Sequence, residues 1–212
     1  MTEWEKELFT YFESRRNIIK LIKYRNYKFT DPKDNLTYER FVEIYNDKPP
    51  EEIKECMSND LTISDKDNPD DNCHVIWTHE TKLNGDKINE INDEISNLNI
   101  KNVILVSDSH PTPTAVDAIK LLKSLYNIKI DVWHFSQTQI FVPEHEYVPQ
   151  HRICSSNEKT KIANTYGLDI PKIHVSDIMI KYLGAIKGNV IEIIRPSETW
   201  PGHKDFTYRI VV

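Results

Sequence analysis

The chain has 212 residues, with 27 Lys and Arg against 33 Asp and Glu and a formal net charge of −6. This length is enough for one large domain or two small ones with a buried core. No apolar run approaches the roughly 20 residues that span a bilayer, and the acidic N-terminus lacks the apolar centre of a signal peptide. We therefore expect no membrane protein, no secreted protein and no general nucleic-acid coat protein, although a local DNA contact is compatible with this charge.

The cysteines and glycines carry no cofactor signature. Cys56, Cys73 and Cys154 lie far apart without a Cys-x-x-Cys pair, which favours a reducing compartment over a disulfide framework. The glycines stand singly, so the chain has neither a GxGxxG turn nor a phosphate-binding loop. We therefore expect no cofactor and no small-molecule substrate.

The N-terminal segment predicts two helices followed by a loop. In residues 3–25, apolar side chains recur at spacings of three and four, which is typical of an amphipathic helix. Residues 38–45 show the same pattern over a shorter length. Residues 47–59 contain Pro49-Pro50 and many charges, so a loop is expected there.

Residues 60–135 alternate between strand and helix patterns. The continuous apolar run at 103–106 is typical of a strand covered on both faces. A helix at 115–126 should be capped by Thr114. This alternation predicts a small, partly parallel sheet with helices packed on it. The other expected elements are strands at 60–63, 73–77 and 128–135, an acidic turn at 64–72, a turn at Asn84-Gly85 and a helix at 86–98. The inner face of the 115–126 helix should consist of Val116, Ile119, Leu122 and Leu125.

A change in sequence composition near residue 138 marks the start of a second unit. Residues 136–150 are polar and contain two prolines, so they are expected to form a break. Ser155 and Glu158 form a capping box for a helix that ends at Gly167. We therefore expect a mixed α/β and α+β protein with two domains, 1–138 and 139–212. The last elements of the second domain are a helix from Ser176-Asp177 to Gly184 and strands at 190–194 and 206–211.

No histidine or cysteine shows a recognisable metal or nucleophile pattern. His145 and His151 lie in a proline-containing loop at a spacing outside the usual zinc motifs. Cys73 and His74 are neighbours on a strand and therefore point to opposite faces. The segment Ser107–His110 contains Ser, Asp and His, but adjacent side chains point apart, so a strand-to-helix turn is expected rather than a triad. No metal site and no catalytic residue are predicted.

A metal-dependent nuclease is the alternative function. Such a core needs an Asp on one strand and an acidic-x-Lys triplet on the next, where the carboxylates hold Mg²⁺. Asp60 followed by Glu80-Thr81-Lys82 has this order. The chain contains three acidic-x-Lys triplets, about as many as its composition produces by chance, so the pattern has no specificity.

The segment Thr112-Pro113-Thr114-Ala115 is the best candidate for a phosphate contact. It begins a helix directly after a buried strand, and the free N–H groups and positive dipole at a helix start suit a phosphate. An ordinary proline-containing helix start explains the same residues equally well.

The C-terminal unit carries a long motif. The run Lys181–Thr199, the closing Tyr208-Arg209-Ile210 and the segment Pro143–His151 closely resemble the H-type subunits of RNA polymerase. These comprise the archaeal H polypeptide and the fifth subunit shared by eukaryotic RNA polymerases I, II and III. The segments Asp47–Pro50, Asn59–Ile63 and Thr112–Ala115 extend the resemblance to the eukaryotic, two-domain form.

The resemblance implies a non-catalytic subunit that acts in transcription. Its N-terminal domain would be a jaw beside downstream duplex DNA, with a restriction-endonuclease-like fold that lacks the cutting residues and with Thr112–Ala115 on the DNA-facing side. Its C-terminal domain would be an assembly domain that docks on the largest polymerase subunit. A cellular member would act in the nucleus, and a member encoded by a large DNA virus in a cytoplasmic factory or the virion. The partner-binding residues that carry over are His145, Tyr182, Gly184, Lys187, Arg195 and Arg209.

The residues of this motif also have a physical interpretation of their own. Gly184 and Gly188 stand where a helix must stop and the chain reverse. The apolar run 190–194 should be buried on both faces or against a partner. Arg195 is suited either to a partner carboxylate or to a solvated strand end. The turn Trp200–Lys204 is about two residues longer than the loop usual in the resembled family.

Overall fold

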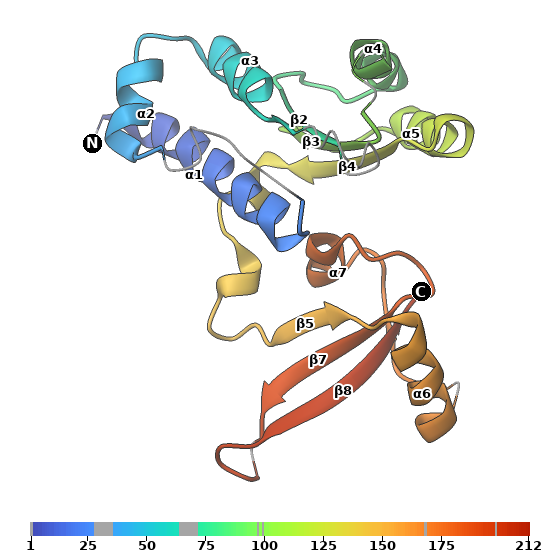
Figure 1. Ribbon diagram of the computed structural model, residues 1–212. Helices are drawn as coiled ribbons and strands as arrows, with labels where there is room; N and C mark the ends of the chain where they lie inside the picture. The colour runs from blue at the N-terminus through green and yellow to red at the C-terminus, as the bar shows by residue number, and fades with distance from the viewer. Residues whose placement is uncertain are drawn as a thin grey trace. The chain divides into compact units, whose positions relative to one another are not determined.

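The computed structural model describes residues 2–27, 36–63, 72–96, 98, 100–167, 169–197 and 199–212. These residues form two compact units, Met1–Ile140 and Phe141–Val212, each with its own sheet (Figure 1). Within the described ranges, no helix combines the length and the apolar character that crossing a bilayer requires. The expected acidic turn at 64–72 lies outside the described residues except for Asn72.

Three helices precede the first sheet. Helix α1 (Glu3–Tyr24) begins with a capping box between Thr2 and Glu5, and α2 (Tyr38–Tyr45) is capped by Thr37. Both helices agree with the predicted ranges. The predicted loop at 47–59 is wrong, because residues Pro50–Asp60 form helix α3. Pro50 occupies the first turn, where proline fits because no N–H is needed, and Ile53 and Met57 are buried one turn apart.

The first sheet has strand order β1-β2-β3-β4. Strands β2, β3 and β4 run parallel, and the short β1 is antiparallel to β2, so the prediction of a partly parallel sheet is confirmed. Two helices connect the parallel strands. The elements are β1 (Thr62–Ile63), β2 (Cys73–Thr78), α4 (Gly85–Ser96), β3 (Asn102–Ser107), α5 (Pro113–Tyr126) and β4 (Lys129–His134).

The two faces of this sheet are covered by different helices. One face packs against α4 and α5 around Ile76, Leu105 and Leu122. The opposite face receives α1 and α3: the Trp77 indole Nε1 donates to the Ser14 Oγ of α1 at 2.9 Å, and the Trp77 backbone N–H donates to the Ser58 Oγ of α3 at 2.8 Å. Burial on both faces explains the continuous apolar pattern of β3.

Both helix starts on this sheet differ from their predicted form. Helix α5 is capped by Thr112 rather than Thr114, because the Thr112 Oγ1 accepts the Ala115 N–H at 3.3 Å. Asn84 is a helix cap rather than part of a free turn, since its Oδ1 accepts the Lys87 N–H at 2.9 Å. Leu125, predicted to lie in the core, is exposed.

The second unit is a four-stranded sheet of order β5-β7-β8-β6 with two helices. The capping box of Ser155 and Glu158 and the helix end at Gly167 are confirmed. The predicted break at 136–150 instead contains most of one short 3₁₀ helix, the whole of a second one and the first residue of β5. The elements are η2 (Phe135–Thr138, in the first unit), η3 (Val142–Glu144), β5 (Gln150–Ile153), α6 (Ser156–Tyr166), β6 (Lys172–Ile173), α7 (Ile178–Leu183), β7 (Val190–Pro196) and β8 (Lys204–Val211).

Strand β7 is the centre of the second unit. Its first four residues are buried, and its two neighbours in the sheet, β5 and β8, both pair with it antiparallel. This burial agrees with the expectation from the apolar run 190–194. Beyond Ile194 the strand becomes exposed, so Arg195 lies on the surface at the end of the β7–β8 hairpin.

Candidate nucleic-acid interface and partner surface

The carboxyl ends of the parallel strands bring polar side chains together in the first unit. Thr78, Ser107 and His134 are aligned by the strand register. In parallel sheets this edge is where ligand-binding residues usually gather. The segment Ser107–His110 and the start of α5 both follow this edge.

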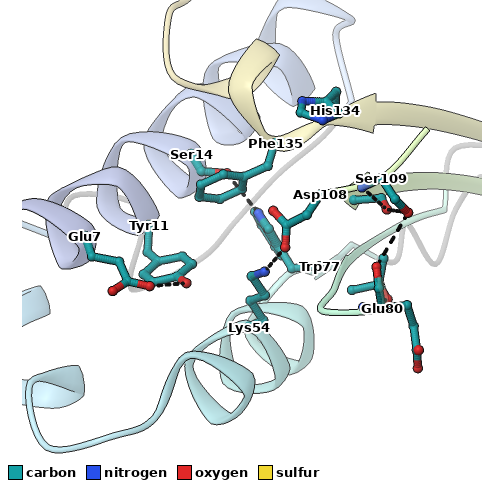
Figure 2. Close-up of polar contacts among 12 residues, drawn as sticks. Glu7, Tyr11, Ser14, Lys54, Trp77, Glu80, Asp108, Ser109, His134 and Phe135 are labelled. Atoms are coloured by element: carbon teal, nitrogen blue, oxygen red, sulfur yellow. Dashed lines mark hydrogen bonds and ion pairs between the residues drawn. The ribbon is translucent and has the colours of Figure 1, made fainter. Parts of the chain in front are cut away.

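Lys54 reaches this edge from α3. Its side chain is only 6% exposed, and it forms an ion pair with Asp108, which is 47% exposed (Figure 2). The Lys54 Nζ also lies 5.8 Å from the centre of the Tyr11 ring and 5.5 Å from that of Phe135. Because one carboxylate and two aromatic rings surround this ammonium group, Lys54 fastens α3 to α1 and to the sheet edge.

Tyr11 is held as a hydrogen-bond donor. Its hydroxyl donates to the Glu7 Oε1 at 3.1 Å. Burial, followed by the neighbouring Glu7 carboxylate, raises the pKa of Tyr11 well above its usual value. Tyr11 therefore stays protonated across the physiological range and does not serve as a base.

The Ser-Asp-Ser-His segment is tied into the backbone rather than arranged for nucleophilic attack. The Ser109 Oγ accepts the Leu83 N–H at 3.0 Å. It also donates to the Glu80 carbonyl at 3.5 Å (Figure 2). The His110 ring stacks on His134, with centres 4.9 Å apart. The strand-to-helix turn expected from the sequence is what the structure contains.

The residues of the nuclease alternative do not converge. The Asp60 Oδ2 accepts the Tyr45 hydroxyl at 3.1 Å, whereas Glu80 lies 3.4 Å from the Nζ of Lys87 and not of Lys82. Across the part of the chain that the structure describes, no group of three His, Cys, Asp or Glu residues could hold a metal ion. The nuclease interpretation therefore has no support.

Cys73 does not present a reactive thiol. It is fully buried, and this burial raises its pKa to about 12. A thiolate is the nucleophilic form, so Cys73 is a core residue. His74, on the same strand, is buried too, and burial lowers its pKa.

The four predicted DNA-proximal residues divide between surface and core. Pro113 and Thr114 are exposed at the start of α5, Thr112 is half-buried, and Ala115 is fully buried. The Thr112 N–H donates to the Leu83 carbonyl at 2.9 Å, and the hydroxyls of Thr112 and Thr114 lie 2.9 Å apart. Since Thr112 already caps the Ala115 N–H, the Thr114 hydroxyl is the group of this segment that is best placed to meet a phosphate.

Among the predicted partner-binding residues, Tyr182 is buried in the second unit and Gly184 forms an exposed helix end. The Tyr182 ring is buried edge-on against Phe141, with ring centres 5.3 Å apart, and its burial raises its pKa. Gly184 ends α7 with φ of 62°, a left-handed conformation that favours glycine. Both residues therefore fix the fold of the motif.

The other predicted partner-binding residues lie at or near the surface of the second unit. Among the described residues, the exposed side chains of Lys187 and Arg195 form no hydrogen bond or ion pair. Arg209 donates to the Lys172 carbonyl at 3.3 Å and joins β8 to β6. The ring of His145 lies 5.6 Å from that of Tyr147. Lys187 and Arg195 are thus the cations of the motif that are free to meet a partner carboxylate.

The sequence analysis missed a network of ion pairs and hydrogen bonds in the second unit. The Arg152 Nε donates to the buried Glu192 at 2.6 Å, and its two terminal nitrogens donate to Glu158 at 3.0 and 2.8 Å. The Tyr208 hydroxyl also donates to Glu192, at 3.2 Å. Hydrogen bonds from Arg152, and then from Ser155, lower the pKa of Glu158 to about 2. Only the pairing of β5 with β7, which sets Arg152 opposite Glu192, reveals this network.

Comparison with known proteins identifies both units. The family profile described as "RNA polymerase Rpb5, N-terminal domain" matches residues 5–95, and "RNA polymerase Rpb5, C-terminal domain" matches residues 140–211. Both profiles belong to one family, and their order along the chain is that of its two domains.

Individual relatives agree with the profiles. Subunit RPABC1 of DNA-directed RNA polymerases I, II and III from Caenorhabditis briggsae is 30% identical over 219 residues, which cover 100% of both chains. Subunit 5A of DNA-directed RNA polymerase V from Arabidopsis thaliana is 25% identical over 95% of this chain and 88% of its own. The Dictyostelium discoideum subunit rpabc1 is 26% identical over 69% of this chain and 75% of its own. The chain therefore belongs to the Rpb5 family of RNA polymerase subunits.

Proposed function

We propose that this chain is a non-catalytic subunit of a multisubunit DNA-directed RNA polymerase and that it acts in transcription. The end-to-end similarity to eukaryotic polymerase subunits is the observation that carries this proposal. For a cellular chain the site of action is the nucleus.

The first unit is proposed as the lower jaw, with a restriction-endonuclease-like fold, beside downstream duplex DNA. Its partly parallel sheet has helices on both faces, and α5 begins at the carboxyl edge with Pro113 and Thr114 exposed. The positive end of the α5 dipole and the Thr114 hydroxyl suit a backbone phosphate. Contact with phosphates carries no base specificity, as a polymerase that travels along DNA requires.

The second unit is proposed as the assembly domain that docks on the largest subunit. Its buried β7 and the Arg152 network supply a rigid body, and Lys187 and Arg195 supply exposed cations near its turns. Arginine suits such a contact because its planar guanidinium pairs with a carboxylate through two parallel hydrogen bonds.

The test of the proposed function is purification of the tagged full-length chain from native extract. The expected result is recovery of the two large polymerase subunits in amounts equal to the tagged chain. Recovery of a clean monomer without these subunits would reject the proposal. In the same assembly, a photoreactive group at position 114 should cross-link to downstream duplex DNA, whereas one at Lys161, an exposed residue of the second unit, serves as the matched control.

A further inference from the structure

Strand β8 is paired along its length on one side only. Toward β7 it pairs without interruption from Lys204 to Ile210. Toward β6 it pairs only at Ile210 and Val211, because β6 is two residues long. Figure 1 shows β8 on the side of β7 that faces away from β5. Within the described part of the chain, the stretch from Lys204 to Arg209 is therefore an open sheet edge.

A proline explains why β6 covers so little of β8. The Ile210 N–H donates to the Pro171 carbonyl at 2.9 Å, so the chain still runs beside β8 at this point. In a parallel ladder, the next acceptor along β8 is the Tyr208 carbonyl, and its donor would be the N–H of residue 171. Proline has no N–H, so the pairing ends there and the rest of the β8 edge stays open.

The alternation along β8 determines which backbone groups the open edge presents. The Val211 N–H donates to the Asn189 carbonyl on the β7 side, whereas the Ile210 N–H donates to the opposite side. Because the register with β7 has no bulge, this alternation continues, and the N–H and C=O groups of Phe206 and Tyr208 point away from β7. Among the described residues, these outward groups have no backbone hydrogen-bond partner.

The side chains beside this edge differ between the two faces of the sheet. Phe206 is 54% exposed and lies in register with Ile194, so both side chains are on the same face. Tyr208 shares this face, since it is two residues further along the strand. The opposite face carries the polar side chains of Asp205, Thr207 and Arg209. A strand that alternates apolar and polar residues in the same way therefore fits the edge.

The chemistry and the surroundings of the edge identify its occupant. A row of outward N–H and C=O groups pairs with another extended polypeptide, and neither DNA nor a small molecule supplies this repeating pattern. Arg195, which the proposed function assigns to the contact with the largest subunit, lies opposite Asp205 at the exposed end of the same hairpin. The open edge is therefore continuous with the surface proposed for this partner.

We propose that the open edge of β8 binds an extended segment of the largest polymerase subunit as an additional strand of the second sheet. The backbone of this segment pairs with the N–H and C=O groups of Phe206 and Tyr208. An apolar side chain of the segment packs beside Phe206, and its polar side chains lie on the face of Thr207. The inference rests on the proposed function, which supplies the partner, and it adds the way in which the two chains join.

The first experiment identifies the neighbour of the edge in the assembled polymerase. Benzoylphenylalanine replaces Phe206 in the tagged full-length chain, and a matched chain carries it at Lys161, an exposed position of α6. After irradiation, mass spectrometry identifies the attached segment. The expected product at position 206 joins a segment of the largest subunit with apolar residues at every second position. Attachment to a second copy of this chain or to DNA, or an equal yield of the same product from position 161, would overturn the proposal.

The second experiment removes one backbone donor and keeps every side chain. Phenyllactic acid at position 206, introduced by codon reassignment, retains the phenyl ring and replaces the outward N–H with an ester oxygen. The largest subunit should then dissociate from the tagged chain about two- to tenfold faster in a salt wash, the effect of one lost hydrogen bond. The same replacement at Phe9, an exposed phenylalanine of the first unit, should leave dissociation unchanged.

Two results of the second experiment would contradict strand addition. One is equal dissociation of the chains with the ester at positions 206 and 9. The other is an unfolding midpoint of the isolated 206 ester far below that of wild type, because this N–H would then already have a partner within the chain. Recovery of the large subunits with the unmodified chain tests the proposed function by itself, so failure of strand addition leaves that function intact.

Discussion

Lys54 in the first unit and Glu192 in the second are both buried charged side chains, and the two units neutralise these charges in different ways. In the first unit the buried Lys54 meets a half-exposed Asp108 and two aromatic rings. In the second, the buried Glu192 accepts from Arg152 and Tyr208, and Arg152 is held in turn by Glu158. A pair with one member in solvent tolerates loss of the buried charge, whereas a network around a buried acid depends on every donor.

The largest expected effect follows loss of the donor in the second unit. Arg152→Ala leaves the Glu192 carboxylate buried with the Tyr208 hydroxyl as its remaining side-chain donor, and should lower the free energy of unfolding by about 3 kcal/mol. Urea denaturation monitored by circular dichroism measures this loss. Adding Glu192→Gln to Arg152→Ala should recover part of it. A loss below about 1 kcal/mol for the single variant would show that the network is solvated.

In the first unit, substitutions of Asp108 and of Lys54 should lower the free energy of unfolding by different amounts. Asp108→Ala leaves the Lys54 ammonium buried without its carboxylate and should cost about 2 kcal/mol. Lys54→Met keeps the length of the side chain and frees only a half-exposed Asp108, so stability should stay within about 1 kcal/mol of wild type. Denaturant titration of both variants decides the comparison. Equal losses would contradict the account of a solvent-facing acid and a buried base.

The N-terminal cap of α5 should contribute less to the free energy of unfolding than either group of buried charges. Thr112→Ala removes the acceptor of the Ala115 N–H and should cost about 1 kcal/mol. Thr114→Ala changes an exposed residue and should stay within about 0.5 kcal/mol of wild type. The thermal unfolding midpoints of the two variants test this order. A larger loss for Thr114→Ala than for Thr112→Ala would indicate that Thr114 is the cap.

The smallest effect is the pH response of Glu158. Its pKa in the folded chain is lowered from the ordinary 4.5 to about 2, so its stabilising contribution is present above pH 4.5 and is lost as the pH falls toward 2. The difference in unfolding midpoint between wild type and Glu158→Gln should therefore shrink as the pH is lowered through this window. In an Arg152→Ala background the difference should be small at every pH, because the main donor is absent.

Local signals in the sequence predicted the regular elements well. The 155–158 capping box, the Gly184 helix end and the spacing of apolar residues in α1 each act within one element, so the chain itself shows them. The prolines at 49–50 misled the prediction because proline ends a helix in its interior but begins one at its first turn. Leu125 follows the apolar spacing of its helix, yet its side chain is exposed, because the sheet and the neighbouring helix cover only the side of α5 that carries Ala115 and Leu122.

The features that the sequence did not predict depend on pairing between distant segments. Strand β6 has two residues and exists because Lys172 and Ile173 pair with the end of β8. The Arg152–Glu192 contact requires the β5–β7 register, and the Lys54–Asp108 pair requires α3 to cross the sheet edge. Sequence patterns indicate contacts between residues that are close in the chain. These two contacts join residues 40 and 54 positions apart, so no local pattern predicts them.

The most direct test of the central claim measures incorporation into the polymerase. Tagged wild type, the double variant Lys187→Glu/Arg195→Glu and the control Lys161→Glu are purified from native extract, and the amount of the largest subunit recovered per tagged chain is quantified by mass spectrometry. The account predicts stoichiometric recovery for wild type and control and a loss of about tenfold or more for the double variant, whose reversed charges would repel a partner carboxylate. Absence of the large subunits from the wild-type sample would contradict the account.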